Sequence, residues 1–421
     1  MFRACGLAAL ALAALAPSAA GQEPVVVVPV KAHALPLGVV TFPNGKAVNL
    51  TVSMGSGAFH HPGEAFGRVW LVSDRGPVIR CADAREQIGL DASELCGGDE
   101  RGVVLPLPRH VPVIYGVDVG ADNVARVTVT IPLKGKSGKP VTGLPSAARL
   151  ARQPAFGPDG TKFEPDPSGL DAEALVKLSD GGFWIGEEHG PSLVHVQADG
   201  TIAKRWVAAG RGADFAGADF PVEEKLPAWL ADPARDFTIE GLAISPDEAF
   251  LYALVQSRTA DVNPGDAEAE RKALILQIER ETGNVTAQYD YALDPRPAFK
   301  RDSSARLRAN AAVRGTELVA LNGGRLMIVE RLSRSAKFYA VELAKAARVQ
   351  ENGIGEAQLP RFRLEKELLL DGDSLRGLPP RIVGLARVSD REMVAVGDNN
   401  FGISAAETRL VRIIFPDPVL R

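Results

Sequence analysis

Acidic side chains recur at equivalent places in a repeated strand pattern, and they are the residues of this sequence best suited to chemistry. Some end an apolar run and others open the next unit: Asp74, Glu188, Glu330, Asp398, Glu240 and Glu317. Carboxylates gathered in one site cannot all stay ionised without cations nearby, because like charges raise each other's pKa. The pattern therefore predicts either a bound cation or paired arginines.

A divalent cation is the first of these two interpretations. Hard oxygen ligands suit Ca²⁺, which is more available outside cells than in the cytosol. The predicted metal ligands are Asp74, Glu240, Glu317, Glu330 and Asp398. In the second interpretation, arginines pair with the acids and stabilise the fold without an ion. The arginines placed to do so are Arg75, Arg314, Arg331 and Arg334.

Two of these arginines are also predicted to bind substrate. Arg75 and Arg331 each follow an acid directly, and guanidinium groups bind phosphate or carboxylate through two parallel hydrogen bonds. Acids and arginines together fit metal-assisted hydrolysis of a phosphoester, in which the ion polarises the phosphoryl group and lowers the pKa of a bound water. The predicted catalytic residues are Glu188, His189 and Glu240.

His189 is the histidine of greatest chemical interest. It follows Glu187 and Glu188, and a neighbouring carboxylate can raise the pKa of an imidazole so that it protonates a leaving group. The alternative is a turn residue before Gly190. A serine nucleophile has little support, because Ser56 lies outside any G-x-S-x-G elbow. Phosphate loops and dinucleotide fingerprints are absent too, so no nucleotide cofactor is expected.

The elements that position these residues are repeated β-hairpins. Five segments share a small or acidic residue, an apolar run, a turn and a second apolar run; they begin near Gly55, Glu173, Glu240, Glu317 and Val383. Turn sequences such as SDGG and NGG separate the paired runs. The wide first gap holds one more unit, residues 111–132, which raises the count to six.

Six similar units, none able to bury both faces alone, fit radial packing. The predicted fold is therefore all-β, a six-bladed β-propeller forming one domain over residues 21–421. Strands around Val25 to Val30 and Val411 to Phe415 are expected to close the ring. The alternative is a two-sheet sandwich, but a sandwich gives no reason for acids to recur at the same strand end.

Composition narrows the classes of partner. The 421 residues carry 48 Lys and Arg against 52 Asp and Glu, a net charge of −4. Such a chain has no global positive field to attract a polyanionic backbone, so nucleic acid is not an expected partner. We expect a monomer that acts on a small molecule, in particular an organic phosphate.

The first twenty residues predict export. Residues 1–20 combine an early arginine, an apolar run from Gly6 to Ala16, Pro17 and small residues up to Ala20, as in a cleaved signal peptide. The run is too short to span a membrane. The mature protein is thus expected in the periplasm or outside the cell, without a membrane span.

Cleavage after Ala20 would leave two cysteines. Cys5 departs with the signal, and Cys81 and Cys96 remain in the mature chain. Two cysteines are too few for a zinc site without histidines nearby, and exported proteins form disulfides readily. A structural Cys81–Cys96 disulfide is therefore predicted.

Several of these segments resemble the phytase-like family described as "esterase-like activity of phytase". The matching motifs are LVSDRG from Leu71, WIGEEHGP from Trp184, IEGLAISPD from Ile239, LMIVER from Leu326 and GDNNFG from Gly397. The resemblance covers the chain from about residue 50 to the C-terminus, and it implies hydrolysis of phosphoesters or carboxylesters. Val383 departs from the family pattern, which has a carboxylate there. The DAADDPA motif of calcium-dependent bacterial phytases is also absent.

Two classes of function follow. The first is an exported phytase-like hydrolase of phosphoesters with a divalent cation, in particular Ca²⁺, in the propeller channel. The second is a non-catalytic propeller that binds a ligand or a protein, with Val383 as the sign of lost chemistry.

Overall fold

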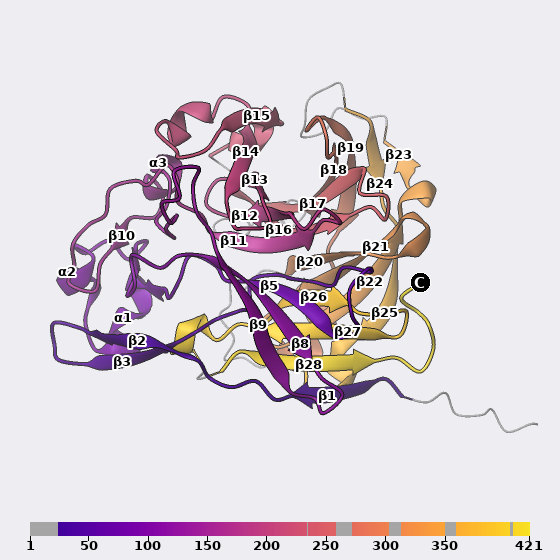
Figure 1. Cartoon of the computed structure of the whole chain (residues 1–421), viewed down its shortest axis with the longest axis horizontal. Coiled ribbons are helices and arrows are strands. Elements are labelled where there is room, and N and C mark those ends of the chain that lie inside the picture. Colours follow the sequence, from indigo (N-terminus) through magenta and orange to yellow (C-terminus); the bar gives the residue numbers. More distant parts are fainter. Residues whose placement is uncertain (1–23, 234, 258–271, 303–312, 350–358, 405–406) are drawn as a thin grey trace, which may run out of the picture.

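The computed structural model describes residues 24–233, 235–257, 272–302, 313–349, 359–404 and 407–421. The predicted signal peptide, residues 1–20, lies outside this part of the chain. The described residues form a ring of β-sheets with short helices between strands (Figure 1). None of the helices in the described residues has the length and hydropathy that a membrane-spanning helix needs.

The first two blades are formed by the N-terminal half of the chain. The first comprises β4 (Ala58–Phe59), β5 (Arg68–Val72), β8 (Val113–Val119) and β9 (Ala125–Pro132). The second comprises β11 (Ala172–Lys177), β12 (Phe183–Glu187), β13 (Ser192–Val196), β14 (Ile202–Ala208) and β15 (Val222–Leu226).

Three more blades follow. The third comprises β16 (Phe237–Ile244), β17 (Phe250–Ser257), β18 (Lys272–Glu279) and β19 (Val285–Ala292), extended by β24 (Arg361–Arg363) and β23 (Ala347–Arg348). The fourth comprises β20 (Arg314–Ala320), β21 (Arg325–Arg331), β22 (Ala336–Glu342) and β25 (Lys366–Asp371). The fifth comprises β26 (Ile382–Arg387), β27 (Glu392–Gly397), β28 (Arg409–Ile414) and β1 (Val26–Val30).

The inner strands of these blades close into a ring. β4 contacts β11, β11 contacts β16, β16 contacts β20, β20 contacts β26, and β26 contacts β4. The all-β propeller prediction is thus confirmed, but the described residues form five blades where six were expected. The reason is that β5 pairs with β8, so the predicted unit at residues 111–132 is the outer half of the first blade.

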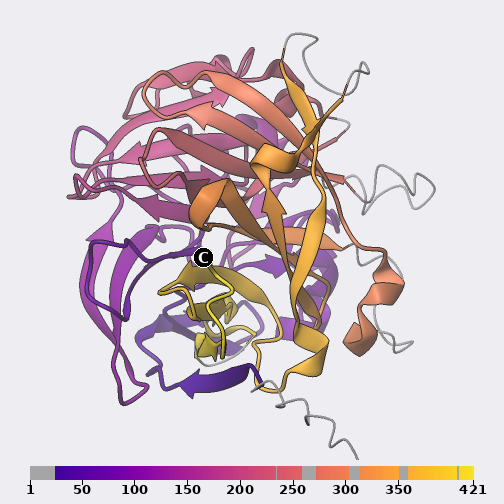
Figure 2. The same cartoon turned by 90° about the vertical axis from the view of Figure 1, so that its right-hand side faces the viewer.

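The ring is closed by the two ends of the chain. β1 pairs antiparallel with β28, with Val26 opposite Ile414 and Val30 opposite Leu410. Figure 2 shows this indigo strand beside the yellow C-terminal strands. The expected closure by strands near residues 25–30 and 411–415 is therefore confirmed.

Apolar side chains between neighbouring blades make the core. Five clusters of buried residues each join two adjacent blades. Trp184 and Trp206 of the second blade, for example, pack with Ile239 and Leu276 of the third. Both faces of each sheet are covered in this way, which explains why the strands read as continuous apolar runs instead of strict alternation.

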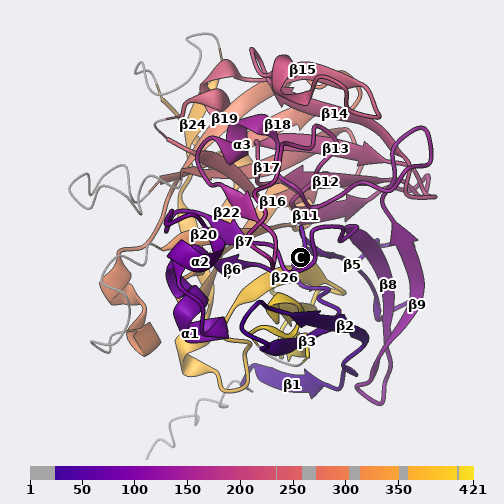
Figure 3. The same cartoon turned by 90° about the vertical axis from the view of Figure 1, so that its left-hand side faces the viewer.

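An insertion between β5 and β8 covers one end of the channel. We call it the cap: residues 79–104, with β6 (Ile79–Arg80), α1 (Ala84–Ile88), α2 (Ala92–Leu95) and β7 (Val103–Val104), together with β10 (Ala155–Phe156). Figure 3 shows the cap beside the hairpin β2 (Pro36–Thr41) and β3 (Ala47–Thr51). The predicted disulfide, Cys81–Cys96, is confirmed inside the small core that the cap shares with this hairpin.

The disulfide should contribute measurably to stability. Its cysteines are 15 residues apart in sequence, and in the chain-entropy model closing such a loop is worth about 3 kcal/mol. The double variant Cys81→Ser/Cys96→Ser should therefore lower the free energy of unfolding in urea by about that amount. An unchanged urea midpoint, or two free thiols in the native oxidised protein, would contradict this prediction.

Candidate active site

Four inner strands carry a β-bulge at the same place. The extra residue is Glu173 in β11, Glu240 in β16, Thr316 in β20 and Val383 in β26. A bulged residue is left out of the strand pairing, which re-aims its side chain. All four line one cavity of about 600 Å³ at the end of the channel where the inner strands begin.

A second ring of residues lies at or just beyond the end of the next strand of each blade. Asp74, Glu188, Arg331 and Asp398 also line this cavity. The third blade has Gln256 at the equivalent place, where its side chain donates to the carbonyl of Val313 and accepts from the Gly315 N–H. Together with Glu240 of the third blade, the repeat thus brings predicted site residues from all five blades to one cavity.

Two predicted metal ligands lie one residue away from these rings. Glu317 follows the bulged Thr316 and is buried deeper in the channel, outside the cavity lining. Glu330 precedes Arg331, and successive strand residues point to opposite faces. It accepts a hydrogen bond from the Tyr291 hydroxyl at 2.6 Å and contacts Lys366. The structure therefore does not bring Glu330 to the cavity.

Acids and arginines line the cavity together. The first and second blades supply Asp74, Glu173 and Glu188, and Asp171 directly precedes β11. The arginines of the lining include Arg75 of the first blade and Arg314, Arg331 and Arg381 of the fourth and fifth blades, and the acids Glu240 and Asp398 lie among the latter. The cap adds Arg80, Asp83 and Gln87 at the mouth. One cavity thus offers oxygen ligands and guanidinium donors at the same time.

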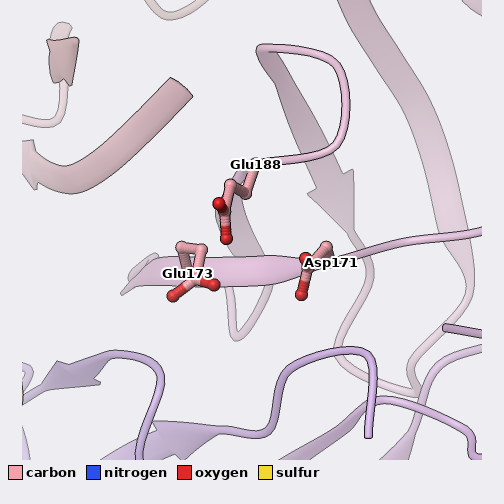
Figure 4. A group of neighbouring side chains, drawn as sticks. All are labelled: Asp171, Glu173 and Glu188. Carbon is pink, nitrogen blue, oxygen red and sulfur yellow. The ribbon is translucent and has the colours of Figure 1, made fainter. Parts of the chain in front are cut away.

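Three carboxylates in the cavity are grouped closely enough to share an ion. One oxygen from each of Asp171, Glu173 and Glu188 lies within 4.8 Å of the others (Figure 4). Sequence reasoning did not select Asp171. The available signal was its spacing, two residues before Glu173 at the start of an inner strand, so that both carboxylates enter the cavity from one strand.

Asp171 is held by two basic side chains. Its carboxylate lies 3.2 Å from Arg75 Nη1 and 3.0 Å from His189 Nε2. Burial alone would raise the pKa of Asp171, but Arg75 and His189 hold that pKa below its ordinary value. Asp171 therefore stays an anion, as a metal ligand must.

His189 lies behind the cavity wall and is not part of its lining. Its Nε2 is 2.5 Å from Arg75 Nη1, so Asp171 and Arg75 both separate it from the cavity. Burial lowers the pKa of His189, although Asp171 opposes this shift. The predicted catalytic histidine is thus brought to the site as a neighbour of Asp171.

The opposite wall contains acids paired with arginines. Glu240 accepts a hydrogen bond of 2.6 Å from the Thr238 hydroxyl and lies 3.6 Å from Arg314 Nη1. Asp398 lies 3.8 Å from Arg381 Nη1. Burial, together with nearby Arg381 and Arg314, lowers the pKa of Arg331 to about 10.

The pKa of Asp74, in the same cavity, is raised. Burial is the main cause, and the neighbouring charges of Asp171 and Asp398 add to it. Its carboxylate accepts a hydrogen bond from the Gly76 N–H at 2.9 Å. A cation bound close by would reverse the effect of the neighbouring acids, because it favours the ionised carboxylate.

The channel narrows sharply beyond the bulges. We call the residues that follow them, together with Gly57 of the first blade, the waist: Gly57, Ala174, Gly241, Glu317 and Gly384. Here the inner strands pack backbone against backbone. A Cβ at Gly57 would lie 2.8 Å from Ala174 Cα, and one at Gly241 would lie 2.7 Å from Leu318 N. Glycine is required at these two positions because the approach leaves no room for a side chain.

Glu317 is the charged residue among the small residues of the waist, and it should make stability depend on pH. Burial raises its pKa well above the ordinary 4.5, although Arg331 and the Leu385 N–H oppose the shift. An acid whose pKa is raised on folding binds its proton more tightly in the folded protein, so stability is lost as pH rises above the pKa of that acid in the unfolded chain.

Glu317→Gln should remove this loss of stability. Urea unfolding should show the variant gaining stability over wild type above about pH 5, with no gain near pH 3. An equal effect at both pH values would contradict the prediction.

The fold and cavity define a five-bladed β-propeller with an acidic and arginine-lined site at one end of its channel. The chain belongs to the phytase-like family described as "Esterase-like activity of phytase", whose model matches residues 56–401. An uncharacterized secreted protein of Arthroderma benhamiae is 26% identical over 188 residues, which make up 38% of this chain and 36% of that protein. The match thus spans little more than a third of the relative's length.

Solved structures resemble the chain only in general outline. A luciferin-regenerating enzyme is 10% identical with a TM-score of 0.35, over 93% of this chain and 95% of that one. The Cps50 (Swd1) β-propeller domain of Myceliophthora thermophila is 9% identical with a TM-score of 0.32, over 92% and 99%. The five-bladed fold therefore follows from the strand pairing and the inner-strand contacts of this chain itself.

Proposed function

We propose that the protein is an extracellular hydrolase of phosphoesters that works with a divalent cation in the channel cavity. The observation that carries this proposal is the charge arrangement of that cavity. Three carboxylates with oxygens within 4.8 Å of one another come from the second blade, and arginines of the fourth and fifth blades line the same space. Family membership agrees with hydrolytic chemistry.

The donor set suits a hard cation. Asp171, Glu173 and Glu188 offer only carboxylate oxygens, the ligands that Ca²⁺ prefers, and we propose Ca²⁺ as the ion. When bound, the ion would polarise the phosphoryl group and acidify a water molecule. Arg75 and His189 contact Asp171, so their proposed role is to hold this ligand ionised and oriented.

The remaining cavity residues receive roles in binding and proton transfer. Arg314, Arg331 and Arg381 bind the phosphate oxygens, because guanidinium groups match phosphate in charge and geometry. Glu240, held by Thr238, accepts the proton of the attacking water. The water oxygen bonds to phosphorus, the ester P–O bond breaks, and the leaving oxygen takes up a proton from solvent.

One observation favours a second function. Val383 occupies the bulge position where the equivalent residues Glu173 and Glu240 carry carboxylates. A propeller that lost catalysis but kept its arginines would bind an organic phosphate without turning it over. The variant Val383→Glu distinguishes the two functions. A binding protein that lacks only this carboxylate should gain phosphoester turnover, whereas an active hydrolase should keep the turnover that it already has.

An extracellular location fits two observations. The Cys81–Cys96 disulfide requires an oxidising compartment, and the Arthroderma relative is a secreted protein. We propose that the chain is exported and acts outside the cytosol. Its substrate would then be a small organic phosphate met in that compartment, with the protein as a monomer.

The test is metal content followed by turnover. Protein purified without chelator should contain close to one equivalent of divalent cation by elemental analysis. It should hydrolyse p-nitrophenyl phosphate or a phosphodiester, and lose that activity with EDTA and regain it with Ca²⁺. Turnover of acyl esters alone, or activity unaffected by chelator, would contradict the proposal. Phosphate binding by calorimetry without turnover would favour the binding protein.

A further inference from the structure

The opposite end of the channel contains a second cavity of about 550 Å³, lined where the inner strands end. Ligand pockets generally measure about 300–1,000 Å³, so this one is large enough for an organic molecule. It shares no lining residue with the first cavity. The waist lies between the two, with inner strands in backbone contact at Gly57 and Gly241. A ligand here would not compete with one at the candidate active site.

The wall of the second cavity is mainly aliphatic. Residues from the ends of several inner strands contribute, among them Leu242, Ile244, Leu318 and Leu385, with Phe59 of the first blade. The first cavity has instead a wall of charged side chains. A polar phosphate would gain little from the aliphatic wall, whereas an apolar chain would leave water on entering it.

The rim adds cationic groups, two of which already pair with acids outside the cavity lining: Lys177 with Glu64 and Arg280 with Glu281. Arg387, Arg280 and Lys177 line this cavity from three blades. Asp247 accepts hydrogen bonds from the Ser245 hydroxyl and the Ala249 N–H, and Glu248 accepts two from Ser179. The two rim acids are therefore satisfied by neutral donors.

Arg387 has one hydrogen-bond donor without an acceptor among the described residues. Its Nη1 donates to Asn322 Oδ1 at 3.1 Å and its Nη2 to Asp390 at 2.5 Å. Its buried Nε–H has no acceptor among the described residues. A buried donor without an acceptor is costly, and a carboxylate is the ligand group that supplies one with complementary charge.

We propose that the second cavity binds an organic carboxylate with an apolar body, whose carboxylate lies at Arg387 and whose body lies against the aliphatic wall. Decanoate is the probe, used below its micellar concentration in calorimetry with the full chain. It should bind with one-to-one stoichiometry and at least about tenfold more tightly than decylammonium, since one hydrogen bond to a charged group is worth at least that factor.

Two variants locate the ligand. Arg387→Met keeps an apolar stem without the donor, so it should weaken decanoate at least about tenfold while leaving decanol binding unchanged. Ala320→Trp fills the cavity at the end of β20 and should abolish binding of both. Arg314→Met, in the first cavity, is the matched control and should leave decanoate affinity unchanged. The absence of decanoate binding, equal binding of decylammonium, or binding that survives Ala320→Trp in a folded variant would overturn the proposal.

Discussion

Glu173→Gln should reduce affinity for the divalent cation by about 100-fold and reduce phosphoester turnover by at least as much. The side chain keeps its size, but a neutral amide replaces one of three carboxylates whose oxygens lie within 4.8 Å of one another. The loss is expected both in metal titrations and in kcat/KM at saturating Ca²⁺, because a weakly held ion is also poorly oriented.

The matched control for this variant is Glu367→Gln. Glu367 is an exposed glutamate on the outer strand β25, and its substitution makes the same change of charge without touching the cavity. Metal affinity and turnover should both stay at the wild-type level. If the two variants behaved alike, the carboxylates of the second blade would have no role in binding an ion.

Arg205→Met should be among the most destabilising single substitutions of this protein, at about 3–5 kcal/mol. Arg205 and Glu187 form a fully buried ion pair at 2.8 Å. Glu187 also accepts hydrogen bonds from the N–H groups of Asp171, His189 and Gly190. Without the guanidinium, a buried carboxylate would lose its counter-charge, and the segment that holds two metal-ligand candidates would lose its support.

Urea unfolding measures this effect directly, and Arg126→Met is the control. Arg126 forms a solvent-exposed pair with Asp122, so its loss should cause no detectable change in the unfolding midpoint. The buried variant should unfold at much lower urea. A midpoint for Arg205→Met equal to that of the control would mean that the pair does not support the second blade.

The fold was largely predictable because its evidence is local. Apolar runs, turn sequences and recurring acids identify each hairpin, and two cysteines in a chain with a predicted signal peptide identify the disulfide. The number of blades was not predictable in the same way. The first inner strand, β4, has only two residues, while β8 and β9 look like an independent hairpin although β8 pairs with β5. The pairing of strands distant in sequence leaves no local pattern.

The candidate site was predictable only in part. Asp171 was not selected, and elsewhere a shift of one residue separates the selected acid from the residue that lines the cavity. Glu240 and Thr316 are equivalent because each is the bulged residue of its strand, but the sequence motif favours Glu317 as the equivalent of Glu240. Glu330 and Arg331 differ in the same way, since a shift by one residue moves a side chain to the other face of a sheet. A bulge is a property of strand pairing, so no single strand reveals it.

The pairing of β1 with β28 has a consequence for how the protein is made. A ribosome makes residues 26–30 long before residues 409–414, so the fifth blade cannot be completed until the later strand has been made. The other four blades would form with one edge of the ring open, and closure would require bringing together segments almost a whole chain apart, which is entropically slow. The final ring would form only after both strands have reached the same compartment.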